Sequence, residues 1–180
     1  MKQEYEEAKT RLQKNPTDKL GLLLYNERKR YFGRYDALLD GLQYGPDYLR
    51  NPEVAEIIRQ ELHHFDGELY TLQAYCIMPN HVHILIDTRL QIPEEWEPED
   101  GECLDYAPLE VIMKRIKGRS AIAANRVLGR SGRFWQRESY DHYVRNEREW
   151  ENILHYILNN PVKVGWVERW EDWPYTYCRP

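Results

Sequence analysis

Two segments of alternating apolar residues, 69–77 and 81–87, constrain the fold of this chain more than any other feature. Side chains alternate between the two faces of a β-strand, so residues two apart share a face. The first segment is expected to bury one face made of Tyr70, Leu72, Ala74 and Cys76. The second is expected to divide into a face of Val82, Ile84 and Ile86 and a face of His81, His83 and Leu85. The break between the two predicted strands is Met78-Pro79-Asn80.

Helical patterns precede these strands. Residues 3–14 and 18–31 are rich in helix formers and are separated by Asn15-Pro16-Thr17-Asp18, which predicts two helices joined by a turn. Glycines and prolines between positions 41 and 52 mark a loop. Apolar residues at helical spacing then predict a helix over 52–65, in which Pro52 suits the first position.

The second half of the chain predicts two more helices. Residues 108–128 form a basic amphipathic pattern that Gly129 is expected to end. Its buried side is expected to hold Leu109, Ile112, Ile116 and Val127. Asn146 is placed to cap a helix over 147–159, which Pro161 ends. Residues 134–144 are expected to be extended, and the aromatic tail over 166–177 is expected to pack on the domain.

The 180 residues suffice for one domain with an appendage. We expect residues 1–47 to form a helical N-terminal segment or insertion and residues 48–180 to form the main domain. A hydrophobic fraction of 42% excludes a disordered chain, and the lack of an 18-residue apolar run excludes a transmembrane helix. No secretory signal is expected. The cysteines, Cys76, Cys103 and Cys178, are odd in number and widely spaced, which predicts reduced thiols in a cytoplasmic protein.

The charged residues are distributed unevenly along the chain. The net charge of −5, taken alone, argues mildly against a nucleic-acid partner. Residues 91–110, which include a predicted acidic loop, carry eight acidic residues and no lysine or arginine. Residues 111–145 carry nine basic residues against two acidic ones, a net of +7. This basic block lies between the predicted histidine strand and the last predicted helix, so the charge pattern is more specific than the net charge.

His81 and His83 are the first candidates for chemistry. They stand two apart on a predicted strand, so they project to the same side, about 7 Å apart by strand rise. Two imidazoles so placed can converge on one divalent cation. A bare pair of this kind is more often two half-exposed strand histidines. The nearby His63 and His64 are interpreted as surface residues.

Tyr156 and Asn160 are the second candidates. Residues four apart share one face of a helix, so a phenol nucleophile would stand beside an amide oxygen able to act as a third metal ligand. The chain has 14 tyrosines, so Tyr156 taken alone is better explained as an amphipathic core residue.

Three segments together resemble one known family. They are residues 74–85 with Met78-Pro79-Asn80-His81-Val82-His83, residues 129–138 with Phe134-Trp135-Gln136-Arg137-Glu138, and residues 156–163 with Asn159-Asn160-Pro161-Val162-Lys163. Their order and spacing resemble the single-tyrosine HUH transposases. The similarity is greatest to the branch of REP-associated tyrosine transposases, which act on repetitive extragenic palindromes in bacteria. The resemblance covers roughly residues 48–178.

The resemblance implies an α+β fold in which helices pack on an antiparallel sheet of the ferredoxin-like or RRM-like kind. It also implies that His81 and His83 bind a divalent metal, Mg²⁺ or Mn²⁺, with Asn160 as a further ligand and Tyr156 as the nucleophile. Attack on a phosphodiester would give a 5′-phosphotyrosine and a free 3′-hydroxyl, without a nucleotide cofactor. Tyr140, Tyr143 and Tyr175 lie outside the helix that precedes the Asn-Pro step, so they are not expected to be nucleophiles.

The activity implied by the resemblance is that of a metal-dependent single-stranded DNA endonuclease and strand transferase that cleaves near hairpin palindromes. Its partner would be single-stranded or hairpin DNA, bound by a monomer or homodimer with no membrane contact. The residues expected to contact DNA are Lys114, Arg115, Lys117, Arg119, Arg133, Trp135, Gln136, Arg137, His142 and Lys163. The alternatives are a solvated helix face over 114–119 and a core position for Phe134 and Trp135.

Two other functions are compatible with part of this pattern. A non-catalytic RRM-like nucleic-acid-binding module, descended from a transposase, would bind DNA without a metal requirement and without cleavage. A small metallohydrolase would need a carboxylate near His83. Asp87 lies four residues further along the predicted strand, which counts against that function.

Overall fold

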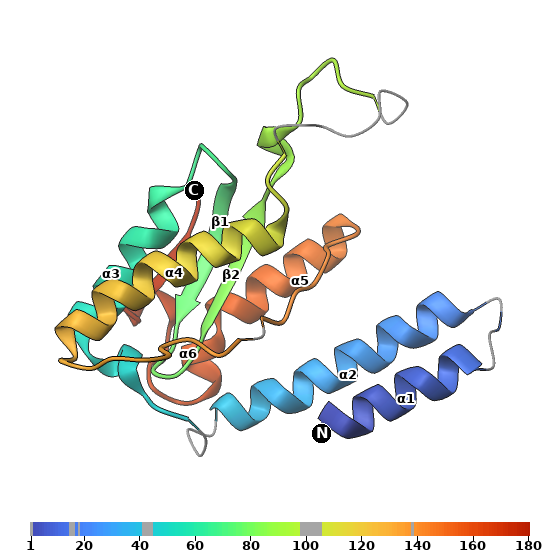
Figure 1. Cartoon of the computed structure of the whole chain (residues 1–180), viewed down its shortest axis with the longest axis horizontal. Helices are drawn as coiled ribbons and strands as arrows, with labels where there is room; N and C mark the ends of the chain where they lie inside the picture. Colours follow the sequence, from blue (N-terminus) through green and yellow to red (C-terminus); the bar gives the residue numbers. More distant parts are fainter. Residues whose placement is uncertain (1, 15–16, 18, 41–44, 98–105, 138) are drawn as a thin grey trace. The chain divides into compact units, whose positions relative to one another are not determined.

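The structure is a computed structural model that describes residues 2–14, 17, 19–40, 45–97, 106–137 and 139–180 (Figure 1). The chain divides into two compact units, Met1–Pro46 and Asp47–Pro180. None of the helices among the described residues combines the length and the apolar character needed to cross a bilayer. Residues 98–105 of the predicted acidic loop, with Cys103 among them, lie outside the described residues, and Cys76 and Cys178 are not in disulfides.

The first unit is a pair of helices, α1 (Lys2–Lys14) and α2 (Leu20–Asp40). Tyr5 of α1 stacks on Tyr31 of α2 with ring centroids 4.9 Å apart, and Arg34 forms an ion pair with Glu4 at 3.3 Å. The prediction that the second helix ends at residue 31 is wrong. The only helix-weakening residue that follows, Gly33, costs about 1 kcal/mol relative to alanine, and the contacts of Tyr31 and Arg34 with α1 hold this part of α2 in place.

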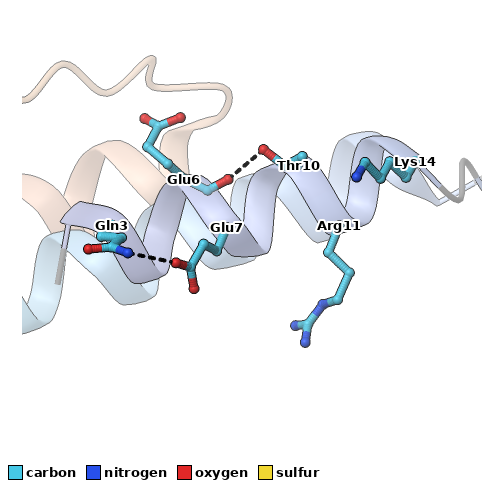
Figure 2. Close-up of a pocket in the computed structure, with 6 residues that line it drawn as sticks. All are labelled: Gln3, Glu6, Glu7, Thr10, Arg11 and Lys14. Carbon is cyan, nitrogen blue, oxygen red and sulfur yellow. Dashed lines mark hydrogen bonds between the residues drawn. The ribbon is translucent and has the colours of Figure 1, made fainter.

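A shallow hollow lies along α1 (Figure 2). It is lined by Gln3, Glu6, Glu7, Thr10, Arg11 and Lys14, all of which come from this one helix. Its hydrogen bonds stay within the helix: the Gln3 amide donates to Glu7 at 3.0 Å, and the Thr10 hydroxyl donates to the Glu6 carbonyl at 2.8 Å. Because no second element contributes to it, the hollow is a helix surface rather than an enclosed site.

The second unit is built on a three-stranded antiparallel sheet of order β2-β1-β3. Its strands are β1 (Thr71–Ile77), β2 (Val82–Asp87) and β3 (Thr176–Cys178). Helices α3 (Pro52–His64) and α4 (Leu109–Val127) pack on one face, and α5 (Glu147–Leu158) packs on the other (Figure 1). The short helix α6 (Asn160–Lys163) follows α5. This arrangement confirms the α+β prediction.

Strands β1 and β2 form a hairpin closed by the Met78 N–H, which donates to the His81 carbonyl at 2.9 Å. The two predicted faces of β2 are confirmed, because Val82, Ile84 and Ile86 pack in the core under α3 and α4 while Leu85 packs in the core under α5.

The single buried face predicted for β1 is wrong. Tyr70 and Leu72 pack in the core under α3 and α4, whereas Ala74 and Cys76 pack in the core under α5. The ladder shifts register between Leu72 and Ala74, where two consecutive residues of β2 pair with β1 residues that are two apart. Gln73 is the extra residue of this β-bulge, and a bulge reverses the alternation of faces beyond it.

Helix α3 begins at the predicted proline and ends close to the predicted glycine. The side chain of Asn51 accepts the N–H of Glu53 at 2.9 Å, Pro52 occupies the first turn, and the helix ends at His64, shortly before Gly67 at φ +84°.

In α4 the buried face consists of Ile112, Ile116, Ser120 and Ala124. Val127, predicted to be buried, is 39% exposed, and Leu128 packs against the core where the helix ends. Gly129 ends the helix as predicted, in a left-handed conformation at φ +59°. Its N–H donates to the Arg126 carbonyl at 3.2 Å, the pattern that closes many helices.

The third strand comes from the C-terminal tail, and residues 134–144 contribute no strand where the structure describes them. The Ile77 N–H donates to the Tyr175 carbonyl at 3.0 Å, and the Arg179 N–H donates to the Gln73 carbonyl at 2.8 Å. The Arg179 guanidinium also binds both carboxylate oxygens of Asp66 at 2.6 Å. The predicted packing of the tail is confirmed, because Trp166, Trp170 and Trp173 lie against the core under α5.

Candidate metal and nucleophile site

His81 and His83 bring their imidazoles together where the β1–β2 turn ends. His81, the last residue of the turn, is 8% exposed, and His83 is the second residue of β2. Their Nε2 atoms lie 3.1 Å apart. Two nitrogen ligands at about 2.1 Å from one cation are about 3.0 Å apart at a right angle and about 3.4 Å apart at the tetrahedral angle. The observed separation therefore fits a pair that shares one cation.

Asn80 orients the first of these imidazoles. Its side-chain oxygen lies 2.7 Å from Nδ1 of His81, and because an amide oxygen only accepts hydrogen bonds, this nitrogen carries the proton. The lone pair of His81 is then on Nε2, the atom that faces His83. A hydrogen bond behind a metal-binding histidine fixes its tautomer and orientation in this way. Asn80 was not among the predicted site residues, although its place beside His81 in the turn could have pointed to it.

Tyr156 lies against the second histidine. It is in the last turn of α5, and its ring meets the edge of His83 with centroids 5.5 Å apart. The following residues, Ile157 and Leu158, are buried in the core under α5 and fix the rotation of this turn. The ammonium group of Lys163 lies 5.4 Å from the Tyr156 ring centroid. The half-buried Tyr156 ring thus lies near both the His83 imidazole and the Lys163 ammonium group.

Asn160 begins α6, one residue beyond the Asn159 break that ends α5. Tyr156 and Asn160 therefore lie in two consecutive helices, and their placement on one face stays a prediction. Asn160 is fully buried, and neither polar atom of its side chain has a hydrogen-bond partner among the described residues. A buried polar group left unpaired costs about 1–3 kcal/mol. Coordination of a cation would satisfy the oxygen of this amide, so the chemistry of Asn160 fits a metal ligand.

Asp87, the carboxylate on the same strand, is engaged elsewhere. It accepts hydrogen bonds from the Arg89 side chain, including Nη2 at 2.5 Å, and from the Arg89 backbone N–H at 2.9 Å. The side-chain hydrogen bonds from Arg89 lower the pKa of this carboxyl. Asp87 therefore forms a local ion pair at the far end of β2 rather than facing His83.

The polar residues predicted to contact DNA fall into two groups. One group consists of exposed side chains, namely Lys114, Arg115, Arg133, Gln136, Arg137 and Lys163. Members of the second group bond to other parts of the protein. Lys117 donates to the Gln136 carbonyl at 3.2 Å, and burial lowers its pKa. Arg119 forms an ion pair with Glu61 of α3 at 2.7 Å, and His142 bonds to Glu149 at 3.0 Å.

Trp135 and its neighbours hold the loop after α4 against the domain. The indole N–H of Trp135 donates to the hydroxyl of the buried Ser120 at 2.9 Å. Phe134 stacks on Tyr48 with centroids 5.6 Å apart, and the Arg130 guanidinium lies 4.4 Å from the centroid of the same Tyr48 ring. Tyr48 and Arg130 were not predicted to join this stack, because Tyr48 is far away in sequence.

Comparison with known proteins places the chain in a family. No family model matches it. A REP-associated tyrosine transposase of Haemophilus influenzae is 33% identical over 135 residues, which cover 74% of this chain and 70% of the relative. The chain belongs to the REP-associated tyrosine transposases. A second member, from Escherichia coli, is 23% identical over 59% of this chain and 53% of its own length, so this chain spans about half of that relative.

A solved structure supports the fold of this family member. The structure of a REP-associated tyrosine transposase bound to a REP hairpin matches with a TM-score of 0.53 and 23% identity. The match covers 73% of this chain and 67% of the other. The resemblance found in the sequence is thereby confirmed at the level of family and fold.

Proposed function

We propose that this member of the family is a metal-dependent single-stranded DNA endonuclease and strand transferase that cuts near hairpin palindromes. The observation that carries the proposal is the contact between Tyr156 and His83, whose imidazole in turn lies 3.1 Å from that of His81. A nucleophile and a cation-binding pair thus meet on one face of the sheet. The proposed nucleophile is Tyr156.

The proposed reaction exchanges one phosphoester bond for another. The phenol oxygen of Tyr156 attacks phosphorus, and the bond from phosphorus to the 3′ oxygen breaks. The phenol loses its proton to solvent, and the departing 3′ oxygen gains one to become a hydroxyl. The 5′-phosphate stays on Tyr156 as an ester, so rejoining needs no nucleotide cofactor. A free phenol has a pKa of about 10, so the attack needs help at neutral pH.

That help is proposed to come from a divalent cation held by His81, His83 and Asn160. When bound, the cation would polarise the scissile phosphate and offset the charge that develops on it. Two imidazoles and an amide form a neutral donor set, and imidazole suits transition metals better than Mg²⁺, which prefers an oxygen environment. We therefore expect Mn²⁺ to support activity at lower concentration than Mg²⁺.

Hairpin DNA is the proposed partner. The solved relative is bound to a REP hairpin, and this chain presents exposed cations on and after α4. Lys114 and Arg115 lie on the exposed face of α4, and Arg133 and Arg137 lie on the loop that follows. Phosphate contacts of this kind position DNA without reading its sequence, so the palindrome specificity must come from other contacts.

Covalent trapping tests the proposal. The protein is incubated with Mn²⁺ and a hairpin oligonucleotide labelled at its 3′ end, and the products are separated on a denaturing gel. A labelled protein–DNA adduct is expected, because the 3′ fragment keeps the phosphate attached to tyrosine. Tyr156→Phe should form none, whereas the matched control Tyr175→Phe, in the tail, should form it normally. An adduct with Tyr156→Phe would refute the nucleophile, and binding without cleavage would favour a non-catalytic module.

A further inference from the structure

Tyr143 is the most exposed of the aromatic side chains that the structure describes in the basic block. Phe134 and Trp135, for which a core position was one of the alternatives, both pack against the core under α3 and α4. Tyr143 is 74% exposed, the largest value among the big hydrophobic side chains that the structure describes as exposed. An aromatic ring presented to solvent at the edge of a basic segment is the kind of group on which unpaired bases stack.

The loop that carries Tyr143 is fastened on both sides of it. One carboxylate oxygen of Glu149 lies 3.0 Å from Nε2 of His142, and the other accepts the N–H of Arg145 at 3.0 Å. The Glu149 N–H in turn donates to the side chain of Asn146, which caps α5. A side chain on a loop held in this way loses little conformational freedom on binding, which favours affinity.

The loop that carries Tyr143 lies where a DNA strand bound at Tyr156 could also contact it. Arg145 and Arg148 are exposed beside Tyr143, against one exposed acidic neighbour, Glu147. Helix α5 then leads directly to Tyr156, nine residues after Glu147, a distance of about 14 Å along the helix axis. Stacked nucleotides advance about 3.4 Å each. A DNA strand with its scissile phosphate at Tyr156 would therefore cover the length of α5 back to Glu147 in about four nucleotides, and the loop that carries Tyr143 lies just before that point.

We propose that Tyr143 is a stacking site for an unpaired base of the DNA strand, a few nucleotides away from the phosphate that Tyr156 attacks. This inference rests on the proposed function, because it takes DNA as the partner. Stacking uses the face that all four bases share, so the site would select for an unpaired base rather than for a particular base. Exposed Arg145 would neutralise a phosphate of the same strand.

Binding measurements on two substrates test this site. The first substrate is a DNA hairpin with short single-stranded flanks on both sides, and the second is the same hairpin without flanks. Tyr143→Ala should weaken binding of the flanked hairpin by at least about fivefold and leave the other unchanged. Tyr143→Phe, which keeps the ring, and Val144→Ala, a neighbouring control, should both bind like the parent protein.

A series of flanked hairpins, each with an abasic site at a different position in the flanks, provides the decisive comparison of binding affinities. At the stacked position it should weaken binding by the parent protein as much as Tyr143→Ala does, and it should have no further effect on that variant. Equal binding of the flanked hairpin by Tyr143→Ala and the parent protein would overturn the proposal, and so would an equal loss on both substrates. If the parent protein binds in this pattern but forms no adduct, the cleavage proposal fails and the stacking site stands. If it binds neither substrate, both proposals fail.

Discussion

Replacement of Asn80 tests whether the β1–β2 turn orients the histidine pair. Asn80→Ala removes the acceptor that lies 2.7 Å from Nδ1 of the buried His81. The lost hydrogen bond alone is worth about 1 kcal/mol, or about fivefold in affinity. The freed ring can also rotate, or carry its proton on the nitrogen that faces His83. Loss of the partner behind a metal-binding histidine lowers metal affinity by about 10- to 100-fold. We therefore expect Mn²⁺ binding to weaken at least about tenfold.

Isothermal titration with Mn²⁺ measures this effect directly. Asn80→Asp, which keeps an acceptor at the same place, should bind at least as tightly as the parent protein. The matched control is Asn159→Ala, whose side chain donates to the His155 carbonyl at 2.9 Å and touches neither histidine of the pair. Circular dichroism checks that each variant is folded. Unchanged Mn²⁺ affinity in folded Asn80→Ala would refute the orienting role, and a parent protein that binds no Mn²⁺ would refute the metal site.

Three further predictions concern stability. Arg179→Ala should lower the free energy of unfolding, measured in urea, by about 1.5–3 kcal/mol, because it removes two charged hydrogen bonds at 2.6 Å. The control Arg169→Ala, which removes an exposed ion pair, should lower it by less than about 1 kcal/mol. Gly129→Ala should lower the free energy of unfolding by about 1–2 kcal/mol, because residue 129 has a positive φ. Gly118 lies within α4 with open space around it, so Gly118→Ala should raise the free energy of unfolding by about 0.5–1 kcal/mol. Burial raises the pKa of Tyr75 to about 12, so its contribution to stability is complete below pH 10 and is lost as the pH rises from 10 to 12. Urea unfolding across that range should show a smaller alkaline loss for Tyr75→Phe, and an unchanged loss would contradict the assignment.

The features that could be predicted from the sequence depend on neighbours along the chain. The two faces of β2 follow from alternation, and alternation alone was enough to place His81 and His83 on one side of the strand. Gly129 and Asn146 lie at helix ends and act on backbone groups only a few residues away. Local chemistry of this kind is encoded within about one turn of helix or one pair of strand residues, and short patterns capture it.

The features that could not be predicted depend on partners far away in sequence. The third strand is held by Arg179, whose partner Asp66 is 113 residues earlier, and no short pattern connects the two. The sequence left both a DNA contact and a core position open for Trp135, and the acceptor that holds its indole is the buried Ser120, 15 residues earlier. Asn80 is an ordinary turn residue by type, and its role at the site depends on where the hairpin directs the His81 ring.

The bulge at Gln73 has a consequence for how strand β1 tolerates changes in length. Because the register shift lies between Leu72 and Ala74, the core under α3 and α4 receives Leu72 before the bulge and Tyr75 and Ile77 after it. Deletion of Gln73 would restore simple alternation and leave the residues on either side of it facing the cores they already fill. An added residue on the turn side would instead rotate the hairpin that carries both histidines. Insertions in β1 between the bulge and the turn should therefore be rejected in directed evolution, whereas deletion of Gln73 should be accepted.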